Sequence, residues 1–191
     1  MKLVFKGKYS GDPESLPNRP HREGAVKFKE FDNFRKFAIA LNIAALILGV
    51  ALIVLYFFRV GTGVMSWGFG LGFLASVLLL IPHEILHAIC VKETAYIYHK
   101  LDQGLLFVFA PESMSRRRFV FMSLLPNILF GFIPYALALI QPEWQFLAAL
   151  GAAGIAAGAG DYFNIFNALT QVPRGGRVYM YGVNSYWYQP A

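Results

Sequence analysis

Hydrophobic residues are concentrated in four long stretches of the chain, which polar segments separate. The stretches are residues 37–58, 64–91, 119–140 and 144–169. Each can cross a hydrocarbon layer of about 30 Å, because a helix rises about 1.5 Å per residue. The pattern predicts an all-α membrane protein with four transmembrane helices, in which residues 37–169 form the membrane domain.

Two polar segments alternate in the way that short strands do. In one, residues 96–98 and 105–109 flank a turn at Asp102-Gln103-Gly104, and in the other, residues 177–188 are rich in Tyr and Trp. Such patterns are typical of β-hairpins. We therefore expect short hairpins on the cytoplasmic side, an N-terminal segment at residues 1–36 and an aromatic tail at residues 170–191.

The basic residues lie mostly on one side of the predicted membrane. Nine Lys and Arg residues precede the first span, one follows it, five lie between the second and third spans, none between the third and fourth, and two in the tail. If both termini are cytoplasmic, sixteen of the seventeen are inside, as the positive-inside rule expects. The sequence predicts a multi-pass protein of the cell membrane with both termini in the cytoplasm.

Composition narrows the possible partners and metal ligands. The chain is 57% hydrophobic with a net charge of +6, and its basic residues flank apolar spans, so membrane orientation explains them better than nucleic-acid binding. The expected partners are the lipid bilayer and a membrane protein or peptide substrate. A single cysteine, Cys90, excludes an internal disulfide and cysteine-rich zinc sites.

The second span contains a metal-binding motif, His83-Glu84-Ile85-Leu86-His87. Residues four apart project from one face of a helix, so the two imidazoles can bind one ion, with Glu84 beside them. A purely structural role is disfavoured because each ionisable residue near mid-bilayer costs roughly 2.5–3.5 kcal/mol. The motif predicts Zn²⁺ bound by His83 and His87, with Glu84 as general base.

A catalytic zinc ion needs a third protein ligand and an open position. Asp161 is the only carboxylate inside another predicted span, and its distance from the cytoplasmic boundary matches that of the His pair. We predict Asp161 as the third ligand. The alternative is a capping or interhelical hydrogen-bonding residue after a glycine-rich stretch.

Further residues near this predicted site could contact a substrate. Asn164 follows Asp161 by one helical turn, and Asn127 follows Pro126 in the third span. Either side chain could bind substrate backbone or support a ligand, and ordinary interhelical bonding is the alternative. Residues 95–109 are a candidate platform for an added substrate strand, or a plain connection.

The arrangement resembles known families. The His-Glu-His motif in one span, followed two spans later by Gly160-Asp161, is similar to the core of the site-2 protease class of intramembrane metalloproteases. More closely, residues 31–188 resemble a family of small bacterial membrane proteins described as putative zincin peptidases. The resemblance implies His83, His87 and Asp161 as ligands and Glu84 as base. Unlike site-2 proteases, the chain lacks Asn and Pro in residues 152–160 and has Tyr162 after the aspartate.

These observations predict a membrane-embedded zinc metalloprotease that hydrolyses peptide bonds. The alternative is a non-catalytic metal-binding membrane protein or scaffold. Glu84 separates the two, because a structural or transport site has little need of a general base beside its ligands.

Overall fold

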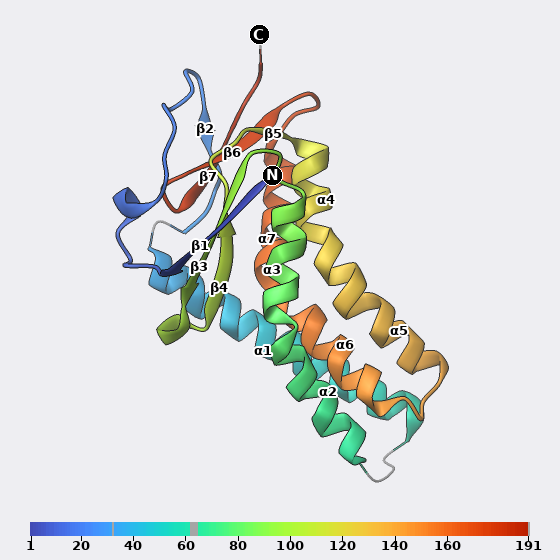
Figure 1. Cartoon of the computed structure of the whole chain (residues 1–191). Helices are drawn as coiled ribbons and strands as arrows, with labels where there is room; N and C mark the ends of the chain where they lie inside the picture. Colours follow the sequence, from blue (N-terminus) through green and yellow to red (C-terminus); the bar gives the residue numbers. More distant parts are fainter. Residues whose placement is uncertain (32, 62–64, 191) are drawn as a thin grey trace.

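The computed structural model describes residues 1–31, 33–61 and 65–190, which form a mostly helical protein with two small sheets. Its α-helices are α1 (Phe34–Val60), α2 (Trp67–Leu78), α3 (Leu80–Ile89), α4 (Arg116–Asn127), α5 (Ile133–Ile140), α6 (Gln145–Ala157) and α7 (Ala159–Gln171). The shorter turns are η1 (Pro13–Ser15), η2 (Leu101–Gln103) and the π-helical η3 (Ile128–Phe132). Helices α1, α2, α5 and α6 extend away from the sheets and the N-terminus (Figure 1).

Two small sheets cover the end of the molecule opposite the α5–α6 connection (Figure 1). The strands are β1 (Lys2–Lys8), β2 (Val26–Lys27), β3 (Thr94–Lys100), β4 (Leu105–Phe109), β5 (Met114–Ser115), β6 (Arg177–Tyr181) and β7 (Asn184–Tyr188). The first sheet has the order β1-β3-β4 and the second the order β2-β7-β6-β5. In the first sheet β1 is parallel to β3, and β3 is antiparallel to β4.

Two antiparallel hairpins, β3–β4 and β6–β7, lie where the sequence predicts strands, but neither stands alone. The N-terminal segment, expected only to be polar, supplies β1 to the first sheet and β2 to the second. The strands therefore form two sheets rather than isolated hairpins. Pairing between residues more than eighty positions apart extends each hairpin into a sheet.

The helices provide two to four candidate membrane spans. Among the described residues, α1 and the run Arg116–Ile140 are each long and apolar enough to cross a membrane. The pairs α2–α3 and α6–α7 also qualify if each is one span, but they bend by 43° and 48°. The second and fourth predicted stretches are thus broken helices rather than straight ones.

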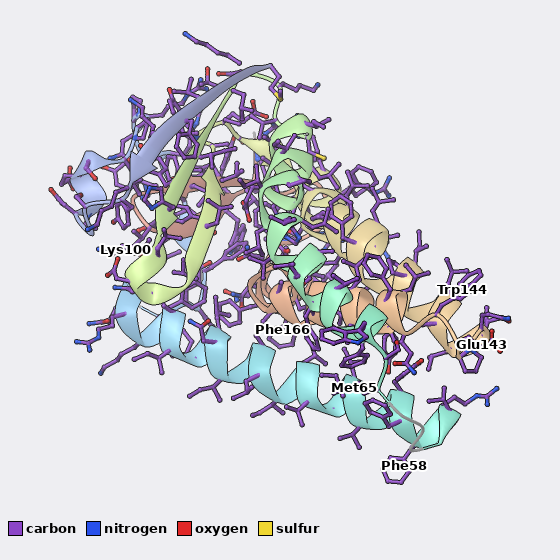
Figure 2. The ribbon with its side chains drawn as sticks, turned by 60° about the horizontal axis from the view of Figure 1, so that its bottom comes forward. Phe58, Met65, Lys100, Glu143, Trp144 and Phe166 are labelled. Atoms are coloured by element: carbon purple, nitrogen blue, oxygen red, sulfur yellow. The ribbon has the colours of Figure 1, made fainter. Side chains whose placement is uncertain are left out.

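Apolar side chains cover the outer surfaces of these helices. Figure 2 shows Phe58, Glu143 and Trp144 at the end of the helices far from Lys100. Phe58 is 82% exposed and Leu46, in the middle of α1, is 67% exposed. Apolar exposure over several helices is unusual in a soluble monomer and typical of a lipid-facing surface.

Small residues bring α6 close to its neighbours inside the bundle. A Cβ added at Gly151 would lie 2.7 Å from Tyr135 Cα, and one added at Gly131 would lie 2.9 Å from the backbone nitrogen of Ile155. Backbones can approach this closely only where a side chain is missing. Gly131 and Gly151 therefore allow close packing of the helices.

Replacing Gly72 by alanine should force α2 away from α6 and lower the free energy of unfolding by about 1–3 kcal/mol. The added Cβ would collide with the Phe146 carbonyl oxygen and lie 2.9 Å from the Ala149 Cβ. Denaturant unfolding in detergent measures the effect. Gly70 is the matched control on the same helix, because a Cβ there meets no atom within 4 Å. Equal destabilisation by the two substitutions would contradict the packing argument.

Candidate metal centre

Helix α3 carries the three residues of the His-Glu-His motif on its buried side. His83, Glu84 and His87 are 8%, 8% and 7% exposed. Their possible ligand atoms all lie within 4.8 Å of one another. The helical repeat explains the grouping, since residues at i and i+4 share one face. A single turn of α3 therefore aligns both imidazoles.

Pro82 accounts for the bend that sets α3 apart from α2. Proline has no backbone N–H, so the carbonyl of Leu78 lacks its usual helical partner four residues later. The helix breaks at Leu79, and the axis turns by 43°. As a result α2 packs on α6, whereas α3 packs on α4 and β4.

Asp161 meets both imidazoles from the first turn of α7. Its Oδ2 lies 3.1 Å from His83 Nε2, and its Oδ1 lies 3.2 Å from His87 Nε2. The carboxylate is 12% exposed. The chain bends at Gly158, between α6 and α7, three residues before Asp161. The structure thus brings together the three side chains that the sequence predicted as zinc ligands.

The hydrogen bond at the far side of the His87 ring fixes its tautomer. His87 Nδ1 lies 2.9 Å from the carbonyl oxygen of Met122. A carbonyl can only accept, so Nδ1 carries a proton, and in the neutral ring Nε2 presents a lone pair. That lone pair faces Asp161 Oδ1 at 3.2 Å. Two lone pairs this close repel each other unless a proton or a cation lies between them. The geometry therefore suits a bound positive ion.

Pro126 explains why the Met122 carbonyl is available. In a regular helix this carbonyl would accept a hydrogen bond from residue 126, but proline cannot donate one. His87 Nδ1 takes the free position. Support of this kind by a backbone carbonyl is common for histidines that bind metals, because it orients the ring.

The donor set fits zinc. Two imidazole nitrogens and one carboxylate oxygen form a typical catalytic zinc site with a fourth position open. The Nε2–Oδ distances of 3.1 and 3.2 Å place the Asp161 carboxylate against both imidazoles. His83, His87 and Asp161 would therefore supply the protein ligands of a zinc ion.

Glu84 lies between the histidine pair and the first sheet. The backbone of Val108, in β4, lies close to its carboxylate. Strand β4 is the last in the order β1-β3-β4. The carboxylate therefore lies beside both the candidate ligands and an outer strand of the sheet.

The two asparagines predicted as substrate contacts differ in their surroundings. Asn127 is 1% exposed and donates a 2.8 Å hydrogen bond to Asp161 Oδ2. Asn164 is half-buried one turn beyond Asp161, and its side chain forms no hydrogen bond within the described residues. Substrate binding by either residue stays a prediction, and Asn127 also contacts a candidate ligand.

A narrow pocket reaches His83 from the helical side. Its cavity volume is about 10 Å³, which is close to the space of one water molecule. It is lined by Ser76, Leu79, Leu80, His83, Phe130, Leu150, Gly154 and Ala157. The pocket can admit water but is too small for a peptide.

Two groups that the sequence does not predict also belong to the site, the Met122 carbonyl and the Tyr162 hydroxyl. Pro126 is the signal for Met122, because a proline four residues later leaves that carbonyl without a helical donor. Tyr162 carries no such signal in the sequence, and its hydroxyl donates to Asn127 Oδ1 at 3.2 Å. Both contacts depend on how α3, α4 and α7 pack.

A comparison with protein families identifies the family of this chain. No curated protein and no solved structure matches it. A family model described as "Putative zincin peptidase" matches residues 76–176, more than half of the chain. The matched segment includes His83, Glu84, His87 and Asp161, and membership in such a family implies zinc binding. The chain belongs to the putative zincin peptidase family.

Proposed function

We propose that this protein is a membrane-embedded zinc metallopeptidase that hydrolyses peptide bonds. The observation that carries the proposal is the meeting of Asp161 with both imidazoles of the motif, at 3.1 and 3.2 Å. The carboxylate of Glu84 lies in one buried group with the two imidazoles. Three protein ligands leave a fourth position open for water, and the Glu84 carboxylate lies beside it. This arrangement favours hydrolysis over a structural role, in which four protein ligands close the site.

Each side chain has a defined part in the proposed reaction. When bound, zinc supplies a water whose pKa is near 7 and polarises the peptide carbonyl. Glu84 takes the proton of the attacking water and passes it to the nitrogen of the leaving amine as the C–N bond breaks. Met122 holds His87 in the tautomer that directs Nε2 to the metal.

We propose a four-span topology with both termini in the cytoplasm. The two apolar helices and the two bent pairs support four spans. Both sheets lie at one end of the molecule (Figure 1), and most Lys and Arg residues belong to the segments around these strands. The positive-inside rule then assigns the sheets to the cytoplasmic side, in the cell membrane.

The proposed substrate is a membrane protein or peptide whose backbone is extended near the site. The position of Val108 beside Glu84 supports an approach along β4, because an outer strand offers unpaired backbone groups to an added strand. The pocket at His83 is too small for a peptide. Asn164, one turn from Asp161, offers an amide that could bind the substrate backbone.

A cleavage assay with the Glu84→Gln variant tests this function. Zinc-loaded protein in detergent is incubated with a pool of apolar peptides, and the products are identified by mass spectrometry. Cleavage by the wild type should stop after chelation and return with added zinc. The variant should be slower by roughly 10²–10⁴-fold, the usual effect of losing a general base. Equal cleavage by the variant would reject Glu84 as the base.

A further inference from the structure

Every polar atom of the Asn127 side chain has a partner. Nδ2 donates to the Ser123 carbonyl at 2.8 Å and to Asp161 Oδ2 at 2.8 Å. Oδ1 accepts from the Tyr162 hydroxyl at 3.2 Å. Because Asn127 is 1% exposed, these bonds are shielded from water. A buried amide with all its groups satisfied is rigid.

The partners leave only one orientation for this amide. A backbone carbonyl and a metal-site carboxylate both accept hydrogen bonds, so the group that faces Ser123 and Asp161 must be the NH₂. The opposite oxygen then needs a donor, and the Tyr162 hydroxyl provides it. The tyrosine therefore fixes the direction in which Asn127 donates.

The break between α6 and α7 makes room for this arrangement. A Cβ at Gly158 would collide with Asn127 Oδ1 and lie 3.0 Å from Tyr162 Cζ. The carbonyl of Gly158 also accepts a 3.0 Å hydrogen bond from the Tyr162 backbone nitrogen. A side chain at this glycine is thus excluded by the asparagine and tyrosine together, and the same break begins the helix that carries Asp161.

We propose that Asn127 and Tyr162 are positioning residues for Asp161. The inference rests on the proposed zinc site and adds two residues that act on a ligand rather than as ligands. Asn127 occupies one side of Asp161 Oδ2 and so restricts rotation of the carboxylate. Tyr162 keeps the amide turned toward it. The carboxylate is therefore oriented toward both imidazoles before an ion binds.

Rotation of the carboxylate is the property that this pair controls. Asp161 uses Oδ2 toward His83 and Oδ1 toward His87, so a small rotation about its side chain would break both alignments. Supporting hydrogen bonds of this kind usually contribute 10–100-fold to metal affinity. Their loss should weaken zinc binding without removing any ligand.

Zinc affinity of the Tyr162→Phe and Asn127→Ala variants tests the proposal. Competition with a chromophoric chelator, using full-length protein in detergent, gives the dissociation constant for zinc alone. We expect Asn127→Ala to bind zinc roughly 10–100-fold more weakly, and Tyr162→Phe to fall near the lower end of that range. Tyr162→Phe removes one hydroxyl and keeps the ring, so it preserves the packing of α7.

Tyr135→Phe is the matched control. The Tyr135 hydroxyl also lies inside the bundle, but it donates its hydrogen bond to the Leu52 carbonyl rather than to a residue of the candidate site. A positioning role lowers zinc affinity in Tyr162→Phe but not in Tyr135→Phe, while the melting temperatures of the two metal-free variants stay similar.

Three results would overturn the inference. If Asn127→Ala and Tyr162→Phe bind zinc as tightly as the wild type, the pair does not position Asp161, although the zinc site stands. If Tyr135→Phe and Tyr162→Phe lose affinity equally, the effect is general destabilisation. If the wild type binds no zinc at all, both this inference and the proposed function fail.

Discussion

The Asp161→Ala variant is expected to lose stoichiometric zinc. Of the three proposed ligands the variant keeps only His83 and His87, whereas a catalytic site needs three protein ligands. The loss in affinity should exceed the roughly 10–100-fold effect of removing only a hydrogen bond to a ligand. Elemental analysis of the purified variant after zinc addition and desalting measures the bound metal. His83→Ala should give the same result.

Asp102→Ala is the control for this prediction. Asp102 lies at the tip of the β3–β4 hairpin, is 55% exposed and pairs with Lys100 at 3.7 Å. Its removal should leave the zinc content unchanged. An Asp161→Ala protein that keeps its zinc while Asp102→Ala also keeps it would show that the third ligand is another residue.

Replacing Glu112 by alanine should lower the free energy of unfolding by about 3–5 kcal/mol, the usual effect of removing one partner of a buried ion pair. Glu112 is 3% exposed and accepts hydrogen bonds from the backbone nitrogens of Lys92 and Glu93, at 2.7–3.1 Å. It also pairs with Arg118. The variant leaves two amides and a guanidinium without an acceptor. Denaturant unfolding in detergent measures the change.

Glu93→Ala provides a matched comparison for Glu112. The Glu93 carboxylate pairs with Arg19, but both side chains are about half exposed. Exposed pairs contribute about 0–1 kcal/mol because water screens them. If the two alanine variants lose the same stability, Glu112 is not the connection between the end of α3 and the start of α4 that its contacts indicate.

The sequence alone predicted the main helices and the contact between α3 and α7. The spacing of His83 and His87 is a local property of one helix. The position of Asp161 could be predicted because depth in a membrane restricts a buried carboxylate to partners at the same level. The lengths and orientation of the predicted spans were therefore enough to predict the contact between Asp161 and the two histidines.

The sheets and helix breaks were harder to predict. Strand β1 contains three apolar residues, 3–5, between lysines, but its partner β3 begins at Thr94, and no local pattern identifies so distant a partner. Pro82 and Gly158 lie inside apolar stretches whose total length suggested straight spans. Membrane helices tolerate such residues because neighbouring groups satisfy the freed backbone atoms.

The role of Asn127 depended on packing rather than on residue type. Its sequence context was compatible with substrate binding, ligand support or interhelical bonding. The contacts with Asp161 and Tyr162 appear only when α4 and α7 lie side by side. A polar residue in a span indicates that a partner exists, but only the fold identifies the partner.

The central claim is that His83, His87 and Asp161 form a zinc site, and the zinc content of the wild-type protein tests it most directly. Protein purified in detergent is saturated with zinc, desalted and analysed for metal per chain. We predict about one zinc ion per chain, in keeping with a single site of three protein ligands. A wild-type protein that retains no zinc after this treatment would contradict the account.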